Sequence, residues 1–116
     1  MRKLKTIVAA LALIGSSMAA EAHATLDHAS PAVGSTVSTS PSQVTLYFTE
    51  QLEPKFSGAE IRKGAGNRVD RGVSVSGKVM RVSVGSLAAG TYTVTWHALS
   101  VDTHKTQGSF SFTVGK

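Results

Sequence analysis

From residue 25 onward, apolar and polar residues alternate in short runs, which is the period of a β-strand with one buried face. The clearest runs are residues 44–49, 90–98 and 109–114. In the second run the aromatic and aliphatic residues share one face, and the threonines share the other face with His97. No window in this part repeats apolar residues at helical spacing over the length of a helix. These runs predict three strands that supply most of a core.

Weaker alternating runs predict four further strands. They span residues 25–28, 59–63, 72–75 and 79–84. The last two are separated by Ser76, Gly77 and Lys78, which favour a hairpin turn, and Met80 is expected to face the core between them. Segments rich in Pro, Gly, Ser and Asn separate the other runs. About seven short strands in this order predict an all-β fold, an immunoglobulin-like Greek-key β-sandwich.

The first 22 residues have the composition of a secretory signal peptide. A basic start with Arg2, Lys3 and Lys5 precedes an apolar run over residues 7–14 and an Ala-x-Ala box that ends at Ala22. The apolar run is too short to span a bilayer, which takes about 20 residues. We therefore expect a signal peptide over residues 1–22 and one exported domain over residues 23–116. Cleavage after Ala24 also satisfies the Ala-x-Ala pattern.

Composition narrows the chemistry that this domain can perform. The chain of 116 residues has no cysteine, so disulfides, iron–sulfur clusters and thiolate-bound metals are excluded. The full chain has a formal charge of +5, and residues 23–116 carry +3 from scattered lysines and arginines that do not form a nucleic-acid-binding patch. No Gly-rich phosphate loop, catalytic triad order or H-E-x-x-H motif is present. A metal site here would have to use nitrogen and oxygen ligands.

Three residues together offer such a ligand set for Cu(II). Cleavage after Ala22 makes His23 the first residue, whose free amine and ring Nδ1 can chelate one ion. Asp102 and His104 are two positions apart, and in an extended segment their side chains would leave on the same side. Three nitrogens and one carboxylate oxygen suit tetragonal Cu(II).

Each of these residues also has a simpler interpretation. Asp102 and His104 would equally fit a solvated loop with a local Asp–His hydrogen bond. His97 falls on the polar face of its strand, and His28 is in phase with Leu26, so the roles of both remain open. Glu50 follows a core-facing run, where it could contact the metal site from outside the ligand set.

Seven segments, taken in order, resemble the CopC family of periplasmic copper-binding proteins. The resemblance covers essentially all of residues 23–116, and its specificity comes from the order and spacing of the segments. They are HA at 23–24, SPAVGS at 30–35, LYFTE at 46–50, FSGA at 56–59, AGTYTVTW at 89–96, SVDTH at 100–104 and GSFSF at 108–112.

The resemblance implies an immunoglobulin-like β-sandwich that binds one Cu(II) ion through the amine and ring of His23 together with Asp102 and His104. Glu50 matches the family's glutamate near that site. Such proteins buffer or carry copper in the periplasm for copper resistance and homeostasis, without catalysis and often with a CopD-type inner-membrane partner. We expect a monomer that has no membrane span once the signal peptide is removed.

One departure from the family pattern bears on the oxidation state of the metal. Relatives carry a methionine-rich loop for Cu(I), whereas residues 63–72 contain Gly, Asn and Arg but no methionine. Because thioether ligands select Cu(I), the sequence predicts a Cu(II) site only.

Two other functions fit parts of the pattern. One is a copper oxidase of the histidine-brace type, which also uses an N-terminal histidine; copper-dependent turnover of a polysaccharide would favour it. The other is an immunoglobulin-like interaction module with incidental histidines, in which His104→Ala would not change copper affinity.

Overall fold

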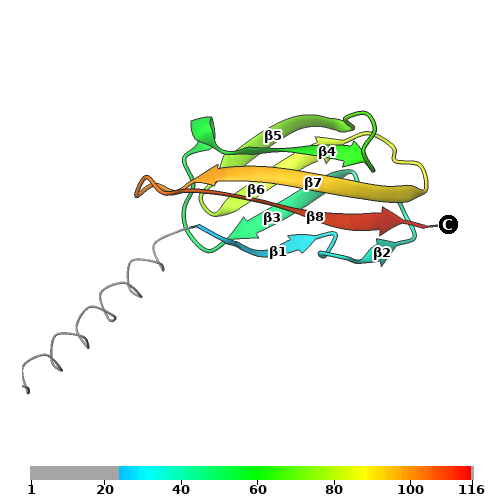
Figure 1. Cartoon of the computed structure of the whole chain (residues 1–116), viewed down its shortest axis with the longest axis horizontal. Helices are drawn as coiled ribbons and strands as arrows, with labels where there is room; N and C mark the ends of the chain where they lie inside the picture. The colour runs from blue at the N-terminus through cyan, green and yellow to red at the C-terminus, as the bar shows by residue number, and fades with distance from the viewer. Residues whose placement is uncertain (1–23, 116) are drawn as a thin grey trace, which may run out of the picture.

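The computed structural model describes residues 24–115, which form eight β-strands and one short 3₁₀ helix (Figure 1). The predicted signal peptide and His23 lie outside the described residues. The elements, in chain order, are β1 (Leu26–Ser30), β2 (Thr36–Val37), β3 (Gln43–Phe48), η1 (Pro54–Phe56), β4 (Gly58–Lys63), β5 (Asp70–Ser76), β6 (Val79–Val84), β7 (Gly90–Leu99) and β8 (Lys105–Val114).

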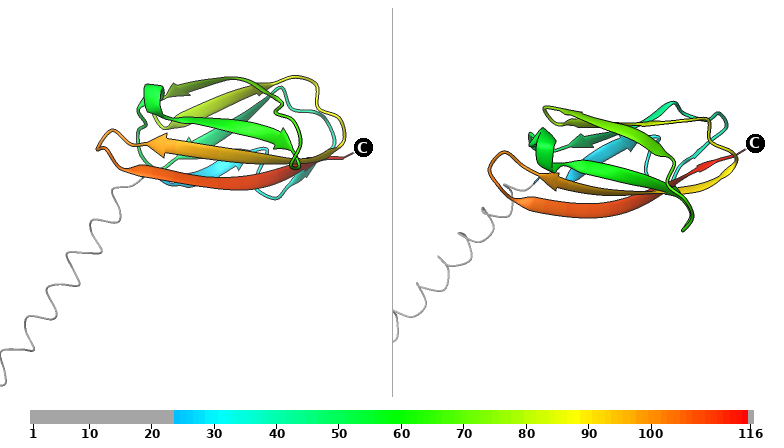
Figure 2. Two further views of the ribbon diagram at one scale, coloured as in Figure 1. Left: turned by 45° about the horizontal axis from the view of Figure 1, so that its top comes forward. Right: turned by 90° about the horizontal axis from the view of Figure 1, so that it is seen from above.

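The strands form two four-stranded sheets that face each other (Figure 2). One sheet has the order β1-β3-β6-β5 and the other β2-β8-β7-β4. All pairs are antiparallel except β2 with β8. The predicted all-β sandwich is confirmed, with eight strands where about seven were expected. The additional strand, β2, is two residues long and therefore too short to produce an alternating pattern.

The core lies between the sheets and is formed by the alternating apolar positions. Trp96 on β7 packs edge-on against Phe48 of the opposite sheet, with ring centroids 5.1 Å apart. Tyr92 stacks on Phe112 of the neighbouring strand at 5.6 Å. Met80 is fully buried, as expected from its position on β6. The faces predicted from the strongest runs are therefore the faces that the protein buries.

Some boundaries differ from the prediction. β8 begins at Lys105, four residues before the expected start at residue 109. The prediction started late because the glycine at position 108 interrupts the alternation of apolar residues. β1 contains an irregularity between Leu26 and His28, so these two residues do not share a face as predicted. The expected turn between β5 and β6 is present, with Gly77 at a φ of 62°.

Three of the candidate residues, Glu50, Asp102 and His104, lie in segments at one end of the sandwich. The loop between β7 and β8 protrudes there, next to the first described residues before β1 (Figure 1). Residues 49–53 also run along this end, where Leu52 forms an isolated bridge with Ser100. Within residues 24–115 there is no helix with the length and apolar character needed to cross a membrane.

Candidate metal centre

Residues 100–104 join β7 to β8, and Val101 to Thr103 form the three-residue turn at their centre. The Thr103 amide donates a hydrogen bond to the Ser100 carbonyl at 2.8 Å, and the Ser100 amide donates to the His104 carbonyl at 3.0 Å. Thr103 has a φ of 72°, the left-handed conformation typical of the last residue in three-residue hairpin loops. This tight turn fixes the directions in which Asp102 and His104 leave the backbone.

The loop brings the side chains of Asp102 and His104 into contact. The His104 Nδ1 lies 3.3 Å from the Asp102 Oδ1, and both side chains are 45% exposed. The sequence interpretation expected this proximity from an extended segment, and that reason is wrong because the residues occupy a turn. The proximity itself is present.

The Ser100 hydroxyl forms a hydrogen bond with the Asp102 carboxylate within the loop. Ser100 is fully buried, and its hydroxyl donates to the Asp102 Oδ1. This hydrogen bond, followed by the contact with His104, lowers the pKa of Asp102 from its usual value. The carboxylate therefore stays ionised, which is the state in which it binds a metal.

Hydrogen bonds to Thr106 and Thr49 attach the first described residues to the same end. The Thr106 hydroxyl donates to the carbonyl of Ala24 at 2.7 Å. The Thr25 amide donates to the Thr49 hydroxyl at 3.0 Å, and the Thr49 amide donates to the Thr25 carbonyl at 2.9 Å. Ala24 has no exposed surface. Ala24, the first described residue, therefore lies against β8 at a position two residues beyond His104.

Glu50 lies between these two segments. Its neighbour Thr49 bonds to Thr25, and the carbonyl of its other neighbour, Gln51, accepts a hydrogen bond from the Val101 amide at 3.0 Å. The Glu50 side chain is half-buried. Within residues 24–115, however, no group of three or more His, Asp or Glu side chains is placed to hold a metal ion. Of the predicted ligands, the described part of the chain brings together Asp102 and His104, while His23 lies outside it.

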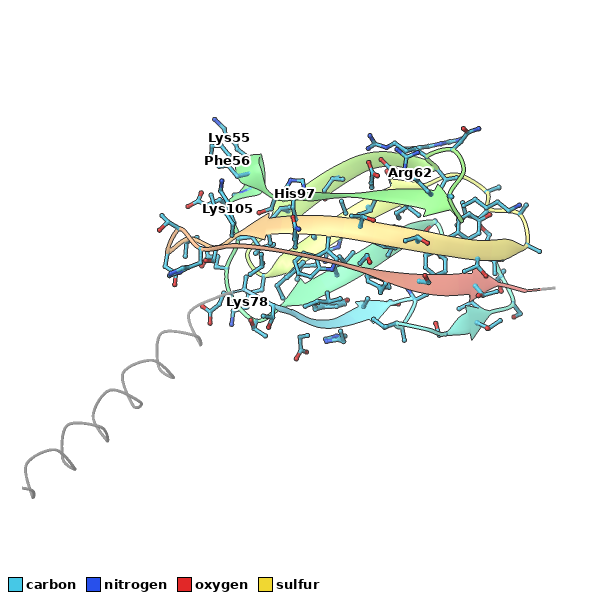
Figure 3. The ribbon with its side chains drawn as sticks, viewed as in Figure 1. Lys55, Phe56, Arg62, Lys78, His97 and Lys105 are labelled. Atoms are coloured by element: carbon cyan, nitrogen blue, oxygen red, sulfur yellow. The ribbon has the colours of Figure 1, made fainter. Side chains whose placement is uncertain are left out.

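The other two histidines are placed away from this pair. His28 is exposed on β1, where its ring stacks on Tyr47 at 4.2 Å and its Nδ1 lies 2.7 Å from the Asp27 carboxylate. His97 is exposed on the outer face of β7 and lies over Gly58. Figure 3 shows His97 set back along the strand from the β7–β8 loop. The prediction that His97 faces outward is therefore confirmed.

Two depressions lie on the outer face of the sheet that contains β7. One, of about 660 Å³, is lined by Glu60, Thr95, His97 and Gln107 among others. The second, of about 450 Å³, lies between His97, Lys105 and the exposed Phe56 of η1 (Figure 3). Neither is lined by Asp102 or His104, whose side chains are both exposed in the β7–β8 loop.

The donor set of this loop fits a divalent ion that accepts imidazole nitrogen and carboxylate oxygen. A neutral imidazole and an ionised carboxylate in contact are ligands for Cu(II) and for Zn(II). An added amine and a second imidazole would shift the preference toward Cu(II), which has the highest affinity among divalent first-row metals for such sites.

Sequence reasoning did not single out Ser100 and Thr106, whose hydroxyls donate hydrogen bonds to Asp102 and to the Ala24 carbonyl. Thr106 is two residues before Gly108 and four before Phe110, so it occupies an inward-facing position of β8. A hydroxyl at such a position needs a partner. The alternating pattern would have indicated Thr106 only if the predicted strand had begun at residue 105 instead of residue 109.

Comparison with known proteins shows which family this chain belongs to. A family model described as the CopC domain matches residues 26–115. The chain belongs to the CopC family. It is 38% identical over 108 residues to copper resistance protein C of Pseudomonas syringae pv. tomato, covering 84% of this chain and 85% of that protein. Family membership links the chain to copper and to copper resistance.

Solved structures of family members share the fold. The crystal structure of CopC from Methylosinus trichosporium OB3b superposes with a TM-score of 0.76 at 32% identity, covering 80% of this chain and 94% of that one. The structure of PcoC from Escherichia coli gives a TM-score of 0.70 at 36% identity, covering 79% and 98%. PcoC is described as a methionine-rich copper resistance protein. In contrast, the described residues of this CopC-family chain contain one methionine, the buried Met80.

Proposed function

We propose that this CopC-family chain is a periplasmic protein that binds one Cu(II) ion and buffers or carries copper for resistance, without catalysis. The ligands are the amine and ring of His23, the Asp102 carboxylate and the His104 imidazole, with Glu50 as an additional contact. The chain acts as a monomer, after removal of a signal peptide over residues 1–22. In this role copper is the cargo of the protein, and a CopD-type inner-membrane protein is the expected partner.

The hydrogen bond from Thr106 to Ala24 is the observation that carries this proposal. It links the residue next to His23 to the strand that begins directly after His104. A chain that starts at His23 would therefore present its amine and ring next to the Asp102–His104 pair. An interaction module with incidental histidines would have no need for this arrangement.

The chemistry of the donors supports Cu(II) over Cu(I). The proposed ligands are nitrogens and one oxygen, which suit Cu(II), whereas Cu(I) prefers thioether or thiolate sulfur. Met80 is fully buried and packs in the core, so its sulfur is not accessible to a surface ion. We therefore propose one Cu(II) site per chain and no Cu(I) site.

The test compares Cu(II) affinity, by competition with a chelator of known affinity, between a chain that starts at His23 and one that carries an extra glycine before it. The extra residue converts the amine into an amide, and we expect it to weaken binding by at least about tenfold. His104→Ala and Asp102→Ala should weaken binding in the same way.

The chain offers a matched control in His28, which contacts the exposed Asp27 much as His104 contacts Asp102. His28→Ala should leave Cu(II) affinity unchanged. Equal affinity with and without the added glycine would rule out the N-terminal chelate. Strong saturable binding of Cu(I) would contradict the Cu(II)-only assignment.

A further inference from the structure

Thr106 is a half-buried polar residue on the side of β8 that faces the core. The inward-facing positions of β8 are Thr106, Gly108, Phe110, Phe112 and Val114, and the last three are buried apolar side chains. Thr106 pairs with Ala98 of β7, which is also buried. Packing alone would place an aliphatic residue here, so the hydroxyl of Thr106 calls for an explanation.

The hydroxyl of Thr106 reaches a backbone carbonyl 82 positions away in the chain. It donates to the Ala24 oxygen at 2.7 Å. Ala24 is fully buried, so no solvent replaces this hydrogen bond if the hydroxyl is removed. Leaving a buried carbonyl without a donor is more costly than losing a solvent-exposed hydrogen bond. The contact therefore fixes where the chain begins its path into β1.

The remaining hydrogen bonds of this segment lead to the other sheet. Thr25 bonds to Thr49, which directly follows β3. Among the described residues, the contact with Thr106 thus ties Ala24 to the sheet that carries the β7–β8 loop. Since Thr106 is two residues after His104, one short segment contains both a proposed ligand and the anchor for its N-terminal counterpart.

We propose that Thr106 is a positioning residue for the metal centre: by holding the Ala24 carbonyl, it places His23 beside Asp102 and His104. Thr106 does not bind the ion itself. This inference rests on the proposed function, because it assigns Thr106 a role only if His23 is a ligand. It adds a residue outside the ligand set on which copper affinity depends.

The experiment uses the chain that starts at His23 and compares Thr106→Val, Thr106→Ala and Thr106→Ser with the unchanged protein. Valine keeps the shape of threonine but removes the donor, whereas serine keeps the hydroxyl. Thr95→Val, on the exposed face of β7, is the matched control. For each variant, Cu(II) affinity, the electron paramagnetic resonance spectrum at one equivalent of Cu(II) and the thermal stability of the copper-free protein are measured.

We expect the valine and alanine variants to bind Cu(II) about tenfold more weakly, because the N-terminal segment is no longer held at β8 in the copper-free protein and must be ordered when the ion binds. Their spectra should show more than one copper environment, because the N-terminal ligands are no longer held in one place. The serine and Thr95→Val variants should match the unchanged protein in both measurements. A merely structural role for Thr106 would lower the stability of the copper-free protein without changing the spectrum.

Two results would overturn the inference. One is a valine variant with unchanged affinity and spectrum, and the other is a serine variant as weak as the valine variant, since the hydroxyl would then not be the group that matters. If the unchanged protein itself binds no Cu(II), the proposed function fails, and the same titration shows this directly.

Discussion

At the residue scale, Asp70 is the clearest case of a buried charge that the fold satisfies. Its side chain is 7% exposed and accepts hydrogen bonds from the Ile61 amide at 2.9 Å and from Arg68 at 2.7 Å. The hydrogen bond from Arg68, followed by that from the Ile61 amide, lowers the pKa of Asp70 below its usual value of 3.8. These contacts tie the start of β5 to β4, the edge strand of the other sheet.

Asp70→Asn should lower the free energy of unfolding by about 2 kcal/mol at pH 7, the usual range for hydrogen bonds to a charged group. The folded-state pKa is lowered, so the stabilisation is complete above the unfolded-state value of 3.8 and is lost as the pH falls through the folded-state value. The difference in unfolding free energy between Asp70→Asn and the unchanged protein, measured by urea unfolding, should therefore shrink as the pH falls below about 4.

Asp27→Asn, at an exposed ion pair, is the control and should change the free energy of unfolding by less than about 0.5 kcal/mol at pH 7. A difference for Asp70→Asn that stays constant down to pH 2 would contradict the assignment.

The residues of the metal centre differ in how far the sequence reveals them. Asp102 and His104 could be predicted because they are neighbours in the chain and any tight or extended conformation keeps them close. The role of Thr106 could not be predicted, because it depends on a partner 82 positions away. That partner is identified only when the start of β1 is placed against β8.

At the scale of elements, the β7–β8 hairpin is the part that carries the site. Its two strands pair over ten positions from Gly90 to Leu99, with the three-residue loop at one end. Thr103 occupies the left-handed position of that loop at a φ of 72°, where its branched side chain is unfavourable. The loop that presents Asp102 and His104 is therefore strained at one residue.

Thr103→Gly should raise the free energy of unfolding by about 0.5–1 kcal/mol, because glycine adopts this conformation without steric cost and the gain exceeds its added chain entropy. Thr103→Ala is the control, since it removes the hydroxyl but keeps the Cβ atom, and it should bring no such gain. Denaturant unfolding of the copper-free protein measures both. A destabilised glycine variant would show that the contact of the Thr103 hydroxyl with the Asp102 carbonyl outweighs the strain.

The strands were predictable where one face is buried and the other is exposed. β7 is the clearest example, since Tyr92, Val94 and Trp96 alternate with exposed or half-buried polar residues. The two-residue β2 and the first part of β8 were missed, because β2 has too few residues to alternate and β8 begins with polar residues on both faces. Both depend on contacts with distant strands rather than on local pattern.

At the scale of the whole molecule, the proposed centre joins the two sheets. Residue 23 leads through Ala24 into β1 of one sheet, whereas Asp102 and His104 belong to the hairpin of the other. An ion bound by both would link the segment before β1 to the β7–β8 loop. Metal binding should therefore resist separation of the two sheets.

Cu(II) at about 100 times its dissociation constant should stabilise the folded protein by about 2.7 kcal/mol, which raises the melting temperature by roughly 10–20 °C for a domain of this size. Thermal unfolding with and without Cu(II) measures the shift, and Mg²⁺ at the same concentration should cause none. His104→Ala should abolish most of the shift. An equal shift in that variant would mean that copper binds elsewhere.

The burial of Ala24 also bears on the fidelity of export. The Ala24 side chain is fully buried, and the Ala24 carbonyl accepts the hydrogen bond of the Thr106 hydroxyl. A chain cut two residues late would begin at Thr25, leaving that position empty and the hydroxyl unpaired. Such a chain would lose a ligand and part of its packing at once. Incorrectly processed molecules should therefore be selectively degraded by proteases, and the pool that survives outside the cytoplasm should consist of chains able to take up the metal.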